Sequence, residues 1–220
     1  MLATLIVESS LLLYVLFRYA LRTPKSKIAS IVLLCLAVFQ LAEYNVCGRF
    51  NIDALVWSKI GFVAITLLPP LGLHLVYVLA KKKTPILVWL AYGSAAVFVY
   101  LFAFSSFAFT SHQCAGNYAI FQLADKLGGW YFFYYYFWLL GTVLLAALFR
   151  RGLKDPGNTG LLYLIAGYGF FMLPTAVVNM MKPDTMLGIP SVMCGFAVVF
   201  AIVLVFGILP EPAPSKKSKH

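Results

Sequence analysis

Seven long apolar runs constrain this chain more than any other feature of its sequence. The runs are Leu2–Leu21, Ile28–Cys47, Leu55–Ala80, Ile86–Phe109, Trp130–Phe149, Gly160–Met180 and Ile189–Leu209. Each has the roughly 20 residues that an α-helix needs to cross the hydrocarbon core of a bilayer. A helix also satisfies its backbone hydrogen bonds internally, which lipid requires. The sequence predicts an all-α, polytopic membrane protein, with a seven-helix transmembrane bundle in residues 1–210 and a short basic tail in residues 211–220.

The composition supports this class. Hydrophobic residues make up 62% of the chain and charged residues only 11%, whereas a soluble domain has about 25% charged residues. The longest stretch between the runs, from Thr110 to Gly128, is predicted to be a loop and leaves no room for a separate soluble domain. We therefore expect a multi-pass protein of a cell membrane, with the lipid bilayer as its first partner.

The distribution of positive charge predicts the orientation of the bundle. The net charge of +10 is also typical of nucleic-acid-binding proteins. With the N-terminus outside, however, only four of the 17 Lys and Arg residues lie on the outer side, namely Arg49, Lys59, Lys126 and Lys182. The other basic residues flank the inner connections or lie in the tail, which is the positive-inside pattern. We expect an outside N-terminus, a cytoplasmic C-terminus and no nucleic-acid partner.

Two of the four cysteines fall on the outer side. Cys47 ends the second run and Cys114 lies in the longest outer loop. An oxidising exterior allows such cysteines to pair, so the pattern favours a Cys47–Cys114 disulfide over two unpaired thiols at helix ends. Cys35 and Cys194 lie within runs and are interpreted as small packing residues. The spacing of the cysteines predicts no metal site.

Polar side chains within the runs gather in the outer half of the bundle. They are Glu8, Gln40, Glu43, Asn45, Lys59 and Asn179. At a rise of about 1.5 Å per residue, Glu43 and Lys59 both lie about 6 Å inside the ends of adjacent runs. This equal depth predicts a Glu43–Lys59 ion pair, with Glu8 as the competing partner of the lysine.

Intramembrane charges usually face the interior of a bundle or a water-filled cavity. Two interpretations of the polar residues stay open. The first is an outward-opening polar pocket for a small molecule, lined by Glu8, Glu43, Lys59 and Asn179. The second is a structural ion pair that holds the helices together.

An aromatic run, "WYFFYYYFW", opens the fifth span at Trp130–Trp138. Trp and Tyr favour the membrane interface, so much of this run is expected to form an aromatic belt. A run of this length surrounds the helix, so some rings must face inward, and Tyr134, Tyr135 and Tyr136 are the candidates. These inward rings either pack in the core or line a pocket.

The third span contains "LLPPLGLH", residues 67–74. Pro69 and Pro70 lack the amide hydrogens that would bond to the carbonyls near Ile65 and Thr66. Neighbouring helices or Thr66 itself can satisfy those carbonyls. We expect a kink at this position that serves as a hinge between the outer and inner halves of the bundle.

Two short motifs and the span layout carry a family resemblance. "LLPPLGLH" lies in the third of seven spans, "RRG" follows the fifth at Arg150–Gly152, and Pro174 lies in the sixth. Together they resemble the seven-helix N-terminal sensor domain of bacterial membrane histidine kinases. The resemblance implies a bundle in the bacterial cytoplasmic membrane that senses a ligand or another signal and drives a cytoplasmic output. No kinase follows Pro210 in this sequence, so we expect a membrane or cytoplasmic protein partner to supply the output.

Catalysis and pigment binding have little support in the sequence. It contains no HExxH motif or Ser–His–Asp set, no lysine in the last span for retinal, and no second histidine that would hold a haem with His74. We expect a non-enzymatic protein without a cofactor. Its function is predicted to be that of a sensor or receptor input module, and the alternative is a structural or accessory subunit of a larger membrane complex.

Overall fold

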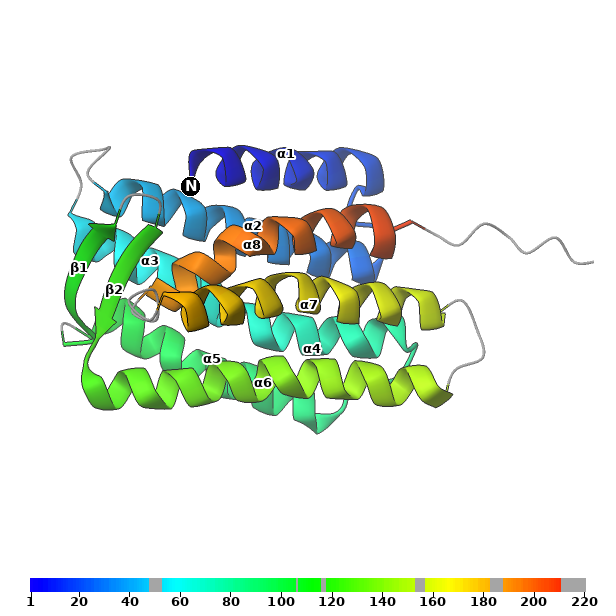
Figure 1. Cartoon of the computed structure of the whole chain (residues 1–220). Coiled ribbons are helices and arrows are strands. Elements are labelled where there is room, and N and C mark those ends of the chain that lie inside the picture. The colour runs from blue at the N-terminus through cyan, green and yellow to red at the C-terminus, as the bar shows by residue number, and fades with distance from the viewer. Residues whose placement is uncertain (48–52, 106, 116–117, 153–156, 183–187, 211–220) are drawn as a thin grey trace, which may run out of the picture.

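The computed structural model describes residues 1–47, 53–105, 107–115, 118–152, 157–182 and 188–210. Seven of its helices are long and apolar enough to cross a membrane, as the apolar runs predicted. These spans lie side by side and alternate in direction (Figure 1). The protein is therefore a helical bundle of the multi-pass membrane class.

The helices match the predicted runs closely. They are α1 (Leu2–Tyr19), α2 (Pro24–Val46), α3 (Ala54–Thr66), α4 (Leu68–Leu79), α5 (Ile86–Phe104), α6 (Asp125–Gly152), α7 (Gly157–Met181) and α8 (Ile189–Val203), which continues as the π-helix η2 (Leu204–Ile208). The third span comprises both α3 and α4. The centre of the bundle is formed by α2 and this third span, which are far more buried than α1 or α5.

Local chemistry sets where α2 begins. The Thr23 side chain accepts a hydrogen bond from the Ser26 amide, and the Ser26 side chain accepts one from the Thr23 amide. This reciprocal arrangement satisfies two amides that have no partner within the helix. Pro24 occupies the first helical position, where its missing amide hydrogen costs nothing.

The stretch predicted to be a loop contains a β-hairpin. Strand β1 (Phe109–Ala115) pairs antiparallel with β2 (Tyr118–Leu123). Ala119 and Phe121 of β2 are buried against the bundle. Phe109, which was predicted to end a span, instead begins β1, because α5 stops at Phe104. The bundle is otherwise helical, so the all-α prediction needs this one addition.

The hairpin and the first residue of the chain lie at the same end of the bundle (Figure 1). We call this the hairpin end. The opposite end carries Lys81–Lys83 after α4 and Arg150 and Arg151 near the end of α6, and we call it the basic end.

The third span is interrupted at Leu67, between the end of α3 and the start of α4. Pro69 and Pro70 lie in the first turn of α4 and are buried. The Leu67 amide donates to the Ala64 carbonyl, and the Leu71 amide donates to the Leu67 carbonyl. The "LLPPLGLH" stretch thus marks a break between two helices, each with its own hydrogen-bond ladder.

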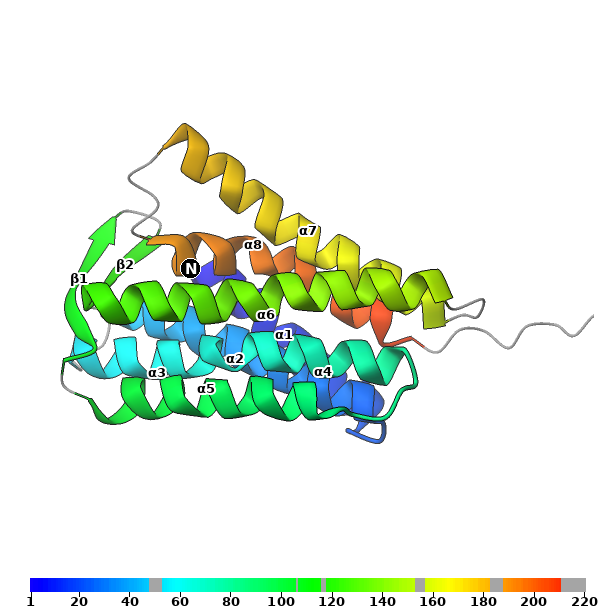
Figure 2. The same ribbon diagram turned by 90° about the horizontal axis from the view of Figure 1, so that it is seen from below.

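Helix α7 diverges from the rest of the bundle toward the hairpin end (Figure 2). Near its middle, Gly167 packs closely against Phe200 of α8. Beyond Pro174 the exposure rises, and Met180 is 82% exposed. The second half of α7 thus exposes Val177, Met180 and Met181, while Thr175 and Asn179 on the same half remain buried.

Candidate functional site: an aromatic cavity at the break in the third span

The aromatic run of α6 divides into two faces. Its buried residues recur at helical spacing and are Tyr131, Tyr134, Tyr135 and Trp138, whereas the exposed ones are Trp130, Phe132, Phe133 and Phe137. The prediction that some rings face inward is correct for Tyr134 and Tyr135, and Tyr136 is only half-buried. Tyr131 was missed, although the spacing of three and four residues along one helix face would have grouped it with the other two tyrosines.

These tyrosines satisfy the backbone at the break. The Tyr134 hydroxyl donates to the Thr66 carbonyl over 2.7 Å. In an unbroken helix that carbonyl would accept from residue 70, which is a proline without an amide hydrogen. The Thr66 hydroxyl donates to the Phe62 carbonyl and also lies 3.1 Å from the Tyr131 hydroxyl. Helix α6 therefore supplies the donor for the Thr66 carbonyl that Pro70 cannot provide.

A cavity of about 480 Å³ lies beside this break. Its size is within the range of small-molecule sites, about 300–1,000 Å³. Four elements line it: Phe62 and Ile65 come from α3, Tyr131 and Tyr135 from α6, and the hairpin and the start of α8 complete the walls. Such a wall is mostly aromatic and aliphatic, with tyrosine hydroxyls as isolated polar groups.

The cavity opens to the surface of the bundle. Its lining includes Gly129 and Phe132 of α6, both of which are exposed. None of its described lining residues belongs to α7, whose second half stands away from the bundle at this end (Figure 2). The exposed part of the lining thus belongs to α6.

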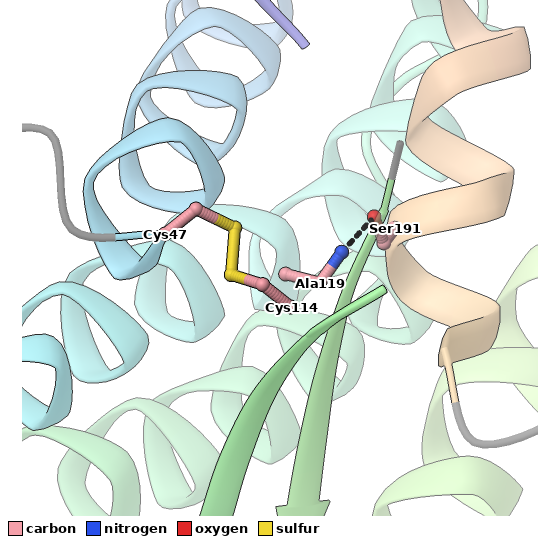
Figure 3. Close-up of a disulfide and its surroundings, with 4 residues drawn as sticks. All are labelled: Cys47, Cys114, Ala119 and Ser191. Atoms are coloured by element: carbon pink, nitrogen blue, oxygen red, sulfur yellow. Dashed lines mark hydrogen bonds between the residues drawn. A yellow bond between two sulfur atoms is a disulfide. The ribbon is translucent and has the colours of Figure 1, made fainter. Parts of the chain in front are cut away.

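The hairpin is fixed over the cavity at two points. Cys47 at the end of α2 and Cys114 of β1 form the disulfide that the cysteine pattern favoured, with Cα atoms 5.7 Å apart (Figure 3). The Ala119 amide of β2 donates to the Ser191 hydroxyl of α8 over 3.1 Å (Figure 3). The hairpin is therefore tied to both α2 and α8.

The four residues predicted to line a polar pocket are arranged differently. Glu8 and Glu43 are both buried and are close enough to interact electrostatically. Lys59 is half-buried on α3, and Asn179 is buried on α7. None of the four belongs to the lining of the aromatic cavity.

The predicted Glu43–Lys59 ion pair is wrong, and so is the alternative pair with Glu8. Within the described part of the chain, both carboxyl oxygens of Glu8 and Oε1 of Glu43 lack a hydrogen-bond partner. Gly61 lies on the face of α3 that packs on α2, close to the side chains of Ala42 and Phe39. Ser58 belongs to this buried face, and Lys59 lies about 100° further round the helix. The predicted direction of the lysine is therefore wrong.

The histidine of "LLPPLGLH" has a packing role. A ring nitrogen of His74 lies 3.3 Å from the Tyr92 hydroxyl of α5, and the two rings meet edge to face. Among the described residues, no group of three or more His, Cys, Asp or Glu side chains is placed to hold a metal ion.

A scan against protein-family models finds no matching family, and a search of curated proteins finds no similar sequence.

Proposed function

We propose that this protein is a membrane receptor or sensor input module that binds an apolar or amphipathic small molecule in the aromatic cavity. The observation that carries this proposal is that the cavity and the helix break share residues. Ile65 and Tyr131 line the cavity, and Tyr131 also lies against Thr66 at the break. A molecule that occupies the cavity therefore touches the one place where the third span is interrupted.

The break offers a way to transmit binding. A ligand shifts a conformational equilibrium only when it binds one state better than the other. Here a ligand that displaces the Tyr131 or Tyr134 ring would change the hydrogen bonds at Thr66, and with them the angle between α3 and α4. Helix α4 leads directly to Lys81–Lys83 at the basic end, so a small rotation at Leu67 would displace these residues. Hinge bending of this kind is a common form of switching.

We propose the orientation with the hairpin end outside the cell and the basic end in the cytoplasm. Two features support it. Basic residues concentrate at the end opposite the hairpin, as they do on the cytoplasmic side of membrane proteins. The Cys47–Cys114 disulfide at the hairpin end suits an oxidising compartment. The cavity would then open toward the outer leaflet of the bilayer, and a cytoplasmic or membrane partner would read the basic end.

The resemblance to the sensor domains of bacterial histidine kinases agrees with this proposal. That resemblance favours a bacterial cytoplasmic membrane and a signalling role. A break in the third span, formed by adjacent prolines, is the feature that the resemblance and the cavity have in common. No chemical step is assigned to the protein, because binding and bending are sufficient for this role.

A second candidate, the accessory subunit of a larger complex, draws on α7. Val177, Met180 and Met181 on its second half are exposed, and this half diverges from the bundle (Figure 2). A neighbouring membrane protein that packs there would cover the exposed methionines. This candidate predicts a stoichiometric protein partner after purification in mild detergent, whereas the receptor predicts a retained small molecule.

Two glycines of α6 allow a matched test of the receptor. A Cβ atom added at Gly129 or at Gly141 would meet nothing within 4 Å, but only Gly129 lines the cavity. We expect the wild-type protein and Gly141→Trp to retain a small molecule that mass spectrometry of the purified protein detects. Gly129→Trp should fold normally and lose that molecule. Equal retention by both variants, or no bound molecule in the wild type, would contradict the proposal.

A further inference from the structure

Two carboxyl groups lie inside the bundle, and neither forms an ion pair with a Lys or Arg side chain among the residues that the structure describes. The chain has seven acidic residues, and Glu8 and Glu43 are the two that fall within apolar runs. Glu8 is 0% exposed and Glu43 is 1% exposed. Glu8 belongs to α1 and Glu43 to α2, and the two groups interact electrostatically across this helix pair.

The surroundings of this pair are polar and incompletely satisfied. The Thr4 hydroxyl donates to Oε1 of Gln40 over 2.8 Å, and Asn45 donates to the Leu41 carbonyl. Yet Nε2 of Gln40 and Oδ1 of Asn45 are buried without a partner in the described residues, as are both oxygens of Glu8 and Oε1 of Glu43. Orphaned buried polar atoms are rare in folded proteins and need a physical explanation.

Among the described residues, the charges that interact with the pair do not balance two carboxylates. The titratable groups that interact electrostatically with it there are the Met1 amino group and the thiol of Cys194 on α8. Lys59 on α3 forms no ion pair with either acid. Ionising two neighbouring carboxyl groups in a site of low dielectric costs free energy, and a bound proton removes the repulsion between them.

We infer that Glu8 and Glu43 form a proton-binding site, in which the two carboxyl groups share a proton between α1 and α2. Such a pair titrates as a unit, with two macroscopic steps that belong to neither residue alone. A protonated carboxyl group also becomes a hydrogen-bond donor, which can donate to an orphaned oxygen of the other carboxyl group. This site is separate from the aromatic cavity and does not depend on the function proposed for it.

The proton site is connected to the hairpin through one serine. Ser191 is a hydrogen-bond partner of the Glu43 carboxyl group, and its hydroxyl also accepts from the Ala119 amide of β2 (Figure 3). When Glu43 carries a negative charge, it draws the Ser191 proton toward itself and leaves the oxygen free for Ala119. When Glu43 is protonated, that arrangement weakens. Protonation of Glu43 thus changes the hydrogen bond between Ser191 of α8 and Ala119 of β2.

Infrared spectroscopy of the full chain in lipid nanodiscs tests this inference directly. At neutral pH we expect the carbonyl stretch of a protonated carboxylic acid, with a shift in frequency when water is replaced by D2O. The other five acidic residues lie outside the apolar runs, so a band that is lost in Glu8→Gln/Glu43→Gln belongs to the pair. Absence of the band at neutral pH would overturn the inference.

Three variants assign the band. The double variant Glu8→Gln/Glu43→Gln should lose it, and either single variant should move the pH at which it disappears. Asp53→Asn is the matched control: Asp53 is exposed and caps α3 by accepting from the Leu55 amide, and asparagine caps equally well. A single variant that titrates as the wild type does would show that no proton is shared. A spectrum without the band, in a protein whose melting temperature rises with sodium or potassium concentration, would replace the proton by a metal cation.

Discussion

The hairpin end contains two neighbouring polar regions that differ in how their buried polar atoms are hydrogen-bonded. Around the break in the third span, the freed Thr66 carbonyl and the tyrosine hydroxyls bond to one another. Between α1 and α2, carboxyl and amide atoms remain without partners. The two regions meet at the start of α8, where Ser191 faces Glu43 and Met193 lines the cavity.

The two regions therefore differ in what we propose they bind: a small molecule beside the break, and a proton between α1 and α2. A satisfied polar network is rigid and specifies one arrangement, so the break region is suited to hold one shape, which we propose a ligand alters. An unsatisfied one gains free energy from a bound proton. The following changes test this contrast, beginning with the one that acts on both regions.

Removal of the disulfide should have the largest effect. The Cys47→Ser/Cys114→Ser variant releases the hairpin from α2, and loss of a native disulfide typically costs about 2–5 kcal/mol of stability. Thermal unfolding in nanodiscs should show a clear decrease in melting temperature. Cys35→Ala is the control, because Cys35 is a buried free cysteine whose loss should cost less. Equal effects of the two changes would mean that the hairpin is not held by its disulfide.

The Tyr134→Phe change tests the satisfied region. It leaves the Thr66 carbonyl without its 2.7 Å donor, and an orphaned buried acceptor costs about 1–3 kcal/mol. Tyr136→Phe, on the same helix and only half-buried, should cost much less. Chemical denaturation of both variants measures the difference. If the two behave alike, the break does not depend on α6.

The Ser191→Ala change separates the two regions. It removes the acceptor of the Ala119 amide, and we expect a cost of about 1 kcal/mol. The specific readout is hydrogen exchange, which should become faster at Ala119 than in the wild type. Ser10→Ala serves as the control, since the exposed Ser10 hydroxyl bonds only to the carbonyl one turn before it. Unchanged exchange at Ala119 would contradict the link between the acid pair and the hairpin.

The Lys59→Met change should have the smallest effect. Without an ion pair to break, it falls in the class of substitutions that change stability by less than about 0.5 kcal/mol. Loss of one partner of a buried pair would instead cost about 3–5 kcal/mol. A melting-temperature decrease of that size would restore the Glu43–Lys59 pair and weaken the case for a shared proton.

The sequence by itself determined the seven spans and the position of the break. These properties follow from run length, the rise of a helix and the missing amide hydrogens of Pro69 and Pro70, all of which are local. It also placed both members of the disulfide at one end, because alternate connections of a helical bundle must meet there.

The tertiary structure decided how each helix is rotated about its own axis. Lys59 and Glu43 are predicted to lie at equal depth, yet close packing of Gly61 on α2 directs the lysine elsewhere. Tyr131 faces the break only because α6 packs beside α4. The cavity likewise requires the hairpin above it and the departure of α7 from the bundle (Figure 2). Rotation about a helix axis and divergence between helices depend on side-chain fit across elements far apart in the chain, and residue spacing within one element does not encode that fit.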